Sequence, residues 1–106
     1  DFLGQVRQWL ASQLAHGVPE RSVAAQQFGL AERAFARRLQ HEGVRYLDLI
    51  DTVRKAAAGT AVADTEQAFM DIAQSLGFSE ASAFNRAFKR WFGAAPGDWR
   101  AARQAR

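Results

Sequence analysis

The sequence predicts an all-α protein with seven helices, and three observations lead to that class. Apolar residues recur at intervals of three and four along most of the chain, which is the spacing of amphipathic helices. Sustained period-two alternation and hairpin turns between β-branched runs, the usual signs of strands, are missing. Glycine or proline interrupts the periodic segments at Gly17, Pro19, Gly29, Gly43 and Pro96, where helices are expected to end or begin.

The first predicted helix runs from Phe2 to about Leu14, with an apolar stripe that includes Val6 and Trp9 or Leu10. A short helix follows over about 20–28 and ends at Gly29, because glycine tolerates the left-handed backbone of a helix stop. The next helix covers about 32–42 and stops at Gly43. These three helices form a first helix-turn-helix unit over about 2–43.

A longer helix is predicted over about 46–63, with Tyr46, Ile50 and Val53 on one stripe and a far end weakened by Gly59 and Thr60. Residues 64–67 are polar and form a connection. Short and long helices then cover about 68–76 and 80–92, and a last one begins near Pro96, a residue suited to a first helical position. The second unit therefore spans about 68–103, and the helix over 46–63 links the two within one domain, 1–106.

The two units contain a repeated motif. Ala25-x-x-Phe28-Gly29-Leu30 recurs forty-eight positions later as Ala73-x-x-Leu76-Gly77-Phe78. In such a helix–turn–helix, a small alanine lets two helices approach, the glycine makes the turn, and the next apolar residue enters the shared core. Two copies indicate a duplicated module, whereas solenoids need at least three. The second helix of such a pair can enter the major groove of DNA.

Helical spacing separates the faces of the two candidate recognition helices. The inward residues are predicted to be Phe35 and Leu39 in the first, and Phe84, Phe88 and Trp91 in the second. The outward residues are Arg33, Ala36, Arg37 and Gln40, and Ser82, Asn85, Arg86 and Lys89. Arginine pairs with guanine edges and asparagine with adenine, so we predict base contacts by Arg33, Arg37, Ser82, Asn85 and Arg86.

Phosphate contacts are predicted for Arg38, Lys89, Arg90 and Arg100. From Asn85 to the end of the sequence, Asp98 is the single acidic residue among six basic ones: Arg86, Lys89, Arg90, Arg100, Arg103 and Arg106. An ion pair with Glu42, four residues later, would explain Arg38 as well as a phosphate contact does. The exposed polar faces of both helices could also simply be solvated. Ser79 is predicted to cap the second recognition helix, whereas Ala31, at the matching place, cannot cap the first.

Other classes of function find little support. The net charge of +3 is modest, and cysteine is absent, which excludes a disulfide framework or thiolate metal site. His16 and His41 are far apart, and there is no nucleophile elbow, phosphate loop or carboxylate pair. We therefore predict neither an enzyme nor a cofactor or metal site. No membrane span or secretory signal is visible, so we expect a cytoplasmic protein.

From about Pro19 to Arg100 the chain resembles the DNA-binding domain of AraC/XylS-type bacterial transcription regulators. The resemblance is strongest over IAQSLGFSEASAFNRAFKRWFGAAPGDWR and looser over GLAERAFARRLQHEG. It implies seven helices, two helix-turn-helix units on a linker helix, and recognition helices in successive major grooves of promoter DNA. It also places Arg33 and Arg37, and Ser82, Asn85 and Arg86, where the family reads bases.

The resemblance leads to further expectations. Ala34 and Ala36 replace residues that are often polar, so base reading by the first unit should be sparse. The small residues of segment 56–63 suggest loosely spaced units. Such regulators usually carry a sensor or dimerisation domain, so we expect the C-terminal piece of a longer, nucleoid-associated regulator, with RNA polymerase as a further candidate partner. The alternative is a helical interaction module whose basic face docks an acidic protein.

Overall fold

The computed structural model describes residues 1–105, and all regular structure in that range is helical. Seven α-helices confirm the predicted class: α1 Phe2–Gln13, α2 Arg21–Gln27, α3 Glu32–His41, α4 Tyr46–Asp64, α5 Phe69–Ser75, α6 Ala81–Phe92 and α7 Pro96–Gln104. A short 3-10 turn, η1 (Leu14–His16), continues α1. Arg106, which was counted among the basic residues, lies outside the described range.

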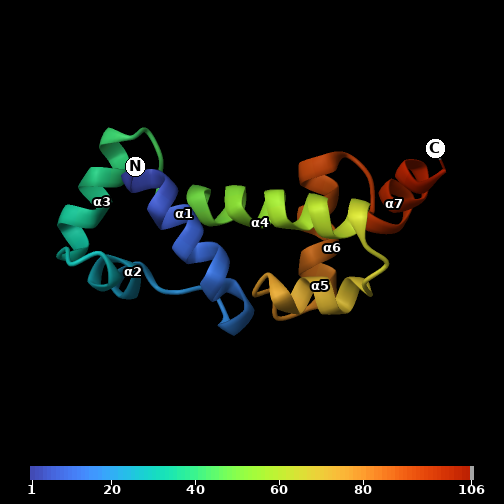
Figure 1. The fold of residues 1–106 in the computed structure, drawn as a ribbon, viewed down its shortest axis with the longest axis horizontal. Coiled ribbons are helices and arrows are strands. Elements are labelled where there is room, and N and C mark those ends of the chain that lie inside the picture. The colour runs from blue at the N-terminus through green and yellow to red at the C-terminus, as the bar shows by residue number, and fades with distance from the viewer. Residues whose placement is uncertain (106) are drawn as a thin grey trace.

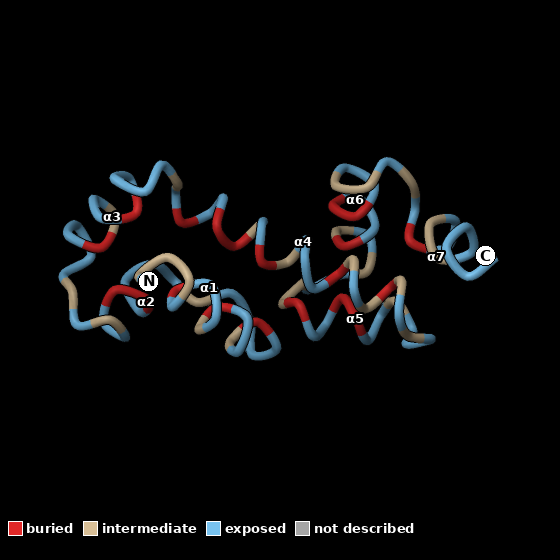
Figure 2. The backbone as a smooth tube through the Cα atoms, turned by 45° about the horizontal axis from the view of Figure 1, so that its top comes forward, coloured by how far each residue is buried: buried red, intermediate tan, exposed pale blue. Residues whose placement is uncertain are grey.

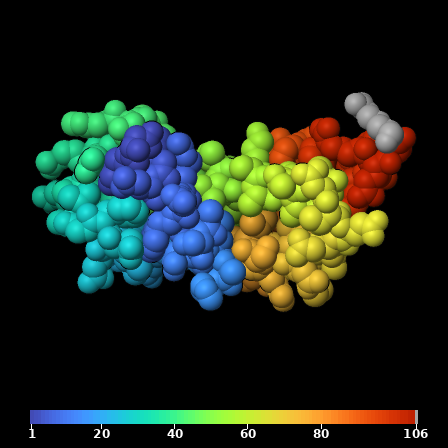
Figure 3. All heavy atoms as spheres, in the orientation of Figure 1, coloured from blue at the N-terminus to red at the C-terminus, as the bar shows by residue number. Residues whose placement is uncertain are grey.

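Helix α4 is the axis of an elongated molecule that measures 47 × 24 × 20 Å. Helices α1–α3 surround its first half and α5–α7 its second half, so the two ends of the chain lie on opposite sides of the molecule (Figure 1). The space-filling view shows two lobes that meet at a narrower middle, where α4 is visible (Figure 3). Helix α4 therefore sets the distance between the two lobes.

Each lobe has a hydrophobic core of its own, and buried segments face inward in both (Figure 2). The first core gathers residues of α1–α3 around Tyr46, Leu49, Ile50 and Val53, which all come from the first two turns and a half of α4. The second gathers residues of α5 and α6 around two smaller α4 residues, Ala58 and Val62. The predicted apolar stripes thus form two separate cores.

Three helices end in the same hydrogen-bonded turn. After α2, the amide of Leu30 donates to the carbonyl of Ala25 at 2.9 Å, and that of Gly29 donates to Gln26 at 3.1 Å. The same pair of bonds follows α3 at Gly43 and α5 at Gly77. All three glycines have a positive φ, between 69° and 82°, which side chains with a Cβ rarely adopt. The glycine stops predicted from the sequence are confirmed.

The repeat has an inserted residue that the sequence motif conceals. Helices α2 and α5 begin at Arg21 and Phe69, forty-eight positions apart, but α3 and α6 begin at Glu32 and Ala81, forty-nine apart. The N-cap residue of α6 is therefore Glu80, which has no side-chain cap bond, and the predicted capping role of Ser79 is wrong. Ala31 does occupy the N-cap position of α3 without a side-chain bond, as expected.

Helix α4 continues without a break through Gly59 and Thr60 to Asp64, one residue beyond the predicted end, so its predicted extent is confirmed. Gly59 is closely packed, because a Cβ at this position would lie only 2.9 Å from the Cζ of Phe92. The small residue therefore makes room for an aromatic ring. Within residues 1–105, no helix combines the length and apolar character that crossing a membrane requires.

Candidate nucleic-acid interface

The outward face of α3 carries the two arginines that the sequence singled out. Phe35 and Leu39 are buried on the opposite side, with 0% and 1% of their surface exposed. Arg33 and Arg37 are exposed and form no side-chain hydrogen bond or ion pair with other residues of the described range. Their guanidinium groups are therefore available to a partner, as predicted from the helical spacing.

The outward face of α6 is built in the same way. Ser82, Asn85, Arg86 and Lys89 are exposed, whereas Phe84 and Phe88 are fully buried and Trp91 is half-buried. The hydroxyl of Ser82 donates to Glu80 at a long 3.4 Å. With the one-residue insertion taken into account, Phe84 matches Phe35, and Arg86 matches Arg37. Each unit thus presents one arginine at the same place on its second helix.

Arg38 lies at the edge of the outward face of α3. Its guanidinium carbon is 4.0 Å from the centre of the Phe2 ring, which is a cation–π contact with α1. The alternative partner, Glu42, forms no ion pair with it among the pairs found in residues 1–105. Arg38 is exposed and keeps donors free for a further contact.

Arg90 is exposed but already has an acidic partner on α4. Its Nη2 lies 3.1 Å from Oδ1 of Asp51, and the Nε1 of Trp91 donates to Oδ2 of the same carboxylate at 3.0 Å. Burial acts to raise the pKa of Asp51, but these hydrogen bonds and the charges of Arg90 and Arg54 outweigh it and lower the pKa. The neighbouring Lys89 has no such partner in the described range.

Arg100 is half-buried and faces the molecule itself. Its Nε donates to the carbonyl of Val62 at 2.9 Å, and its guanidinium carbon lies 4.4 Å from the centre of the Phe69 ring. Its Nη2 is enclosed without a partner in the described residues. These contacts attach α7 to the end of α4 and to α5, a geometry that favours a structural role over the predicted phosphate contact.

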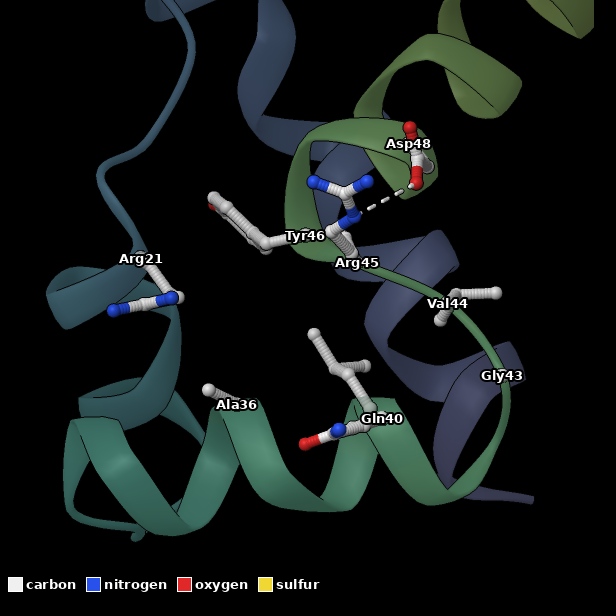
Figure 4. Close-up of a pocket in the computed structure, with 9 residues that line it drawn as sticks. Arg21, Ala36, Gln40, Gly43, Val44, Arg45, Tyr46 and Asp48 are labelled. Atoms are coloured by element: carbon white, nitrogen blue, oxygen red, sulfur yellow. Dashed lines mark ion pairs between the residues drawn. The ribbon is translucent and has the colours of Figure 1, made fainter.

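A hollow of about 570 Å³ lies beside α3, and Ala36 and Gln40 point into it from that helix (Figure 4). Arg21, the first residue of α2, and Arg45, which precedes α4, stand on its far side. Sequence reasoning missed these two arginines, although each directly precedes or begins a helix after a predicted turn. Both are exposed, and each already has an acidic partner, because their Nε atoms lie 3.8 Å and 3.9 Å from carboxylates of α3 and α4 respectively.

A family model described as a helix-turn-helix domain matches residues 24–102 of this chain. The HTH-type transcriptional regulator VirS of Mycobacterium tuberculosis is 43% identical over 77 residues, which are 73% of this chain and 23% of VirS. The chain belongs to the AraC-type helix-turn-helix family. The resemblance drawn from the Gly-Phe-Ser turn and the following helix is therefore confirmed.

Other known proteins are similar to this chain in sequence or in fold. The ornithine utilization regulator of Pseudomonas aeruginosa is 36% identical over 84 residues, 79% of this chain and 25% of that protein. A transcriptional dual regulator of Escherichia coli has the same fold, with a TM-score of 0.91 and 18% sequence identity. The match covers 100% of this chain and 95% of that one. The DNA-binding domain of AdpA, solved with a target DNA, has a TM-score of 0.83 and 25% sequence identity. The match covers 97% of this chain and 93% of that domain. The chain spans about a quarter of the length of the curated relatives that it matches.

Proposed function

We propose that this chain binds double-stranded promoter DNA in a sequence-specific manner and thereby regulates transcription. One observation carries the proposal. Two equivalent helices, α3 and α6, each expose an arginine at the same place, Arg37 and Arg86, and neither arginine has a hydrogen-bond or ion-pair partner among residues 1–105. An exposed arginine at that place can form two parallel hydrogen bonds with a guanine edge once its helix lies in the major groove.

The dimensions of the molecule fit two successive grooves. Helix α4 has 19 residues and is therefore about 28 Å long at 1.5 Å per residue. One turn of DNA is about 34 Å, and the molecule is 47 Å long. The recognition helices lie in the lobes at either end of α4 (Figure 1). In the proposed complex both face the same side of the duplex, and a single chain reads an asymmetric site.

The exposed residues divide into two roles in this complex. Arg33, Arg37, Ser82, Asn85 and Arg86 contact bases. Lys89 and Arg38, together with Arg21 and Arg45 beside the hollow, contact phosphates, which fix position without reading sequence. Arg90 keeps 62% of its side chain exposed, so it can reach a phosphate while its pair with Asp51 persists. Arg100 holds α7 and takes no part.

The wider role belongs to the same proposal. VirS and the ornithine utilization regulator are named as regulators, and the AdpA domain was solved with its target DNA. We infer a longer, cytoplasmic parent regulator in which further segments sense an effector or dimerise, and in which RNA polymerase is a candidate contact. The rival reading is a helical module whose basic face docks an acidic protein.

Selection of bound sequences from a random duplex library tests the proposal. We expect enrichment of one asymmetric site, and affinity for random duplex that falls steeply between about 50 and 200 mM salt as phosphate contacts are lost. A library that yields no enriched sequence, together with a flat salt response, contradicts DNA binding. Tight binding to an acidic protein in the same buffers would then favour the rival.

A further inference from the structure

The two lobes meet at a stretch of α4 that contributes to neither core. Val53 is the last α4 residue of the first core and Ala58 the first of the second, and residues 54–57 between them are half-buried or exposed. The apolar packing inside each lobe therefore does not determine how the two lobes are oriented relative to each other. That orientation depends on α4 and on the contacts around this stretch. The contacts that Asp51 and Arg54 make from this part of α4 are polar and directional.

Arg54 connects α4 to the turn of the second unit. Its Nε donates to the carbonyl of Leu76 at 2.8 Å, and its Nη2 donates to that of Gly77 at 2.9 Å. The guanidinium carbon also lies 4.0 Å from the centre of the Phe78 ring. Carbonyls at the end of a helix lack intrahelical partners, so α5 needs such a donor. One side chain thus binds three successive residues of the turn that precedes α6.

Asp51 lies three positions earlier, on the same face of α4. Its carboxylate accepts hydrogen bonds from Arg90 and Trp91, near the end of α6. The polar pair Asp51 and Arg54 therefore holds α6 at two places: the turn before its first residue and its last turn. Two separated contacts determine the direction of a helix, which a single contact cannot do.

The turn held by Arg54 also lies against the first lobe. A Cβ built on Gly77 would meet the carbonyl oxygen of Leu14 at 2.9 Å, Nη2 of Arg54 at 3.2 Å and Val18 Cγ2 at 3.5 Å. Leu14 belongs to η1, which continues α1. The backbone at Gly77 is therefore enclosed by residues of both lobes and of α4, at the place where the two lobes are in contact.

We propose that Arg54 and Asp51 are positioning residues that fix the direction of α6 relative to α3, and thereby the spacing between the two half-sites that this chain accepts. The inference rests on the proposed DNA binding. No equivalent polar contact from α4 reaches α3 or its turn within residues 1–105; the side chain of Tyr46 donates instead to Pro19, before α2. The second recognition helix is thus the one whose direction depends on directional bonds.

The first arm of the test measures binding to duplexes in which the selected site is lengthened or shortened by single base pairs. Each base pair turns one half-site by about 34° relative to the other. Arg54→Lys keeps the charge but cannot make both carbonyl bonds in the same geometry. We expect the preference for the native spacing to fall from about tenfold in the parent to about threefold. Arg7→Lys, the same change at an exposed site on α1, is the matched control and keeps the parental profile.

The second arm measures orientation without DNA. The sequence has no cysteine, so Gln26→Cys and Gln74→Cys introduce two unique sites, both exposed and at equivalent places on α2 and α5. Pulsed electron paramagnetic resonance on the spin-labelled protein should give a narrow distance distribution that broadens with Arg54→Lys and not with Arg7→Lys. If Arg54→Lys does not fold, as judged by circular dichroism, Asp51→Asn takes its place in both arms.

The two arms separate the possible failures. A spacing profile and distance distribution that match those of Arg7→Lys would overturn the positioning role even if the parent binds its site tightly. A parent that binds no duplex would overturn the proposed function, whereas a broadened distribution would still support control of orientation by Arg54. Loss of affinity that is equal at all spacings, with no broadening, also overturns the inference, because it would indicate a plain charge contact.

Discussion

The two units share one turn but are attached to α4 by different forces. The first surrounds four large side chains of α4, Tyr46, Leu49, Ile50 and Val53, which are buried in its core. The second buries two smaller α4 residues, Ala58 and Val62, with Ala61 packed against them, and hydrogen bonds from Arg54 and Arg100 and to Asp51 supplement that packing. Apolar burial is non-directional, whereas hydrogen bonds require defined geometry. A duplicated motif can thus keep its internal structure while its attachment changes.

The largest effects should come from the equivalent core phenylalanines, Phe35 and Phe84, which are both fully buried. We expect Phe35→Ala and Phe84→Ala each to lower the free energy of unfolding by about 3–5 kcal/mol. Because the cores are separate, amide hydrogen exchange should accelerate mainly in the lobe that carries the substitution. Uniform acceleration across both lobes for either variant would show one cooperative core and break the comparison.

The equivalent turn glycines should differ. Gly29 and Gly77 have φ values of 69° and 82°, so alanine at either position is expected to cost about 1–2 kcal/mol of backbone strain. Within residues 1–105, and apart from its chain neighbours, nothing lies within 4 Å of a Cβ on Gly29, whereas a Cβ on Gly77 would meet the backbone oxygen of Leu14 at 2.9 Å. Chemical denaturation should therefore show a larger loss for Gly77→Ala than for Gly29→Ala. Equal losses of stability in the two variants would mean that the contact of Leu14 with the turn at Gly77 does not restrict a side chain there.

A smaller effect is expected at the starts of the recognition helices. Ala31 occupies the N-cap position of α3 with extended backbone, φ −64° and ψ 150°, and offers no side-chain acceptor. Ala31→Ser should stabilise the protein by about 1 kcal/mol, measured as a rise in Tm, by supplying the missing cap bond. Ser79→Ala, at the position aligned by sequence alone, should leave Tm nearly unchanged. A clear loss from Ser79→Ala would restore the capping role rejected above.

The smallest effect is expected in the dependence of stability on acidic pH. The pKa of Asp51 is lowered from its ordinary value of 3.8, because hydrogen bonds from Arg90 and Trp91 and the charges of Arg90 and Arg54 outweigh burial, so the folded state favours the carboxylate. Its contribution to stability is complete above pH 3.8 and is lost as the pH falls through the lower folded-state value. Asp51→Asn should flatten the fall of Tm below about pH 4. A Tm that falls with pH as steeply in Asp51→Asn as in the parent would contradict this assignment.

Much of the fold could be predicted because local signals agree with it. Glycine stops at Gly29, Gly43 and Gly77 and apolar spacing of three and four are local properties, and they located all seven helices within a few residues. The outward positions of Arg37 and Arg86 follow from the same spacing. The extra residue before α6 could not be found in this way, because the motif around Gly77 repeats at forty-eight positions whether or not the next helix starts later.

The partners of the arginines could not be predicted either. Arg54 carried no sequence signal, since it is one polar residue on a helix and its acceptors are carbonyls twenty-two and twenty-three positions away. The charge pattern predicts phosphate contacts for Arg38 and Arg100 but not their stacking on Phe2 and Phe69, nor the bond from Arg100 to a backbone carbonyl. Charge patterns identify basic side chains; only the packed structure shows which of them remain free.

The most direct test of two equivalent reading helices is a repeat of the duplex selection with Arg37→Ala and with Arg86→Ala. Each variant should lose about 1–3 kcal/mol of specific binding and relax base preference in one half-site only, a different half-site for each. Arg7→Ala should leave both half-sites intact. If both variants altered the same base positions, or if neither changed the selected sequence, two separate reading helices would be contradicted.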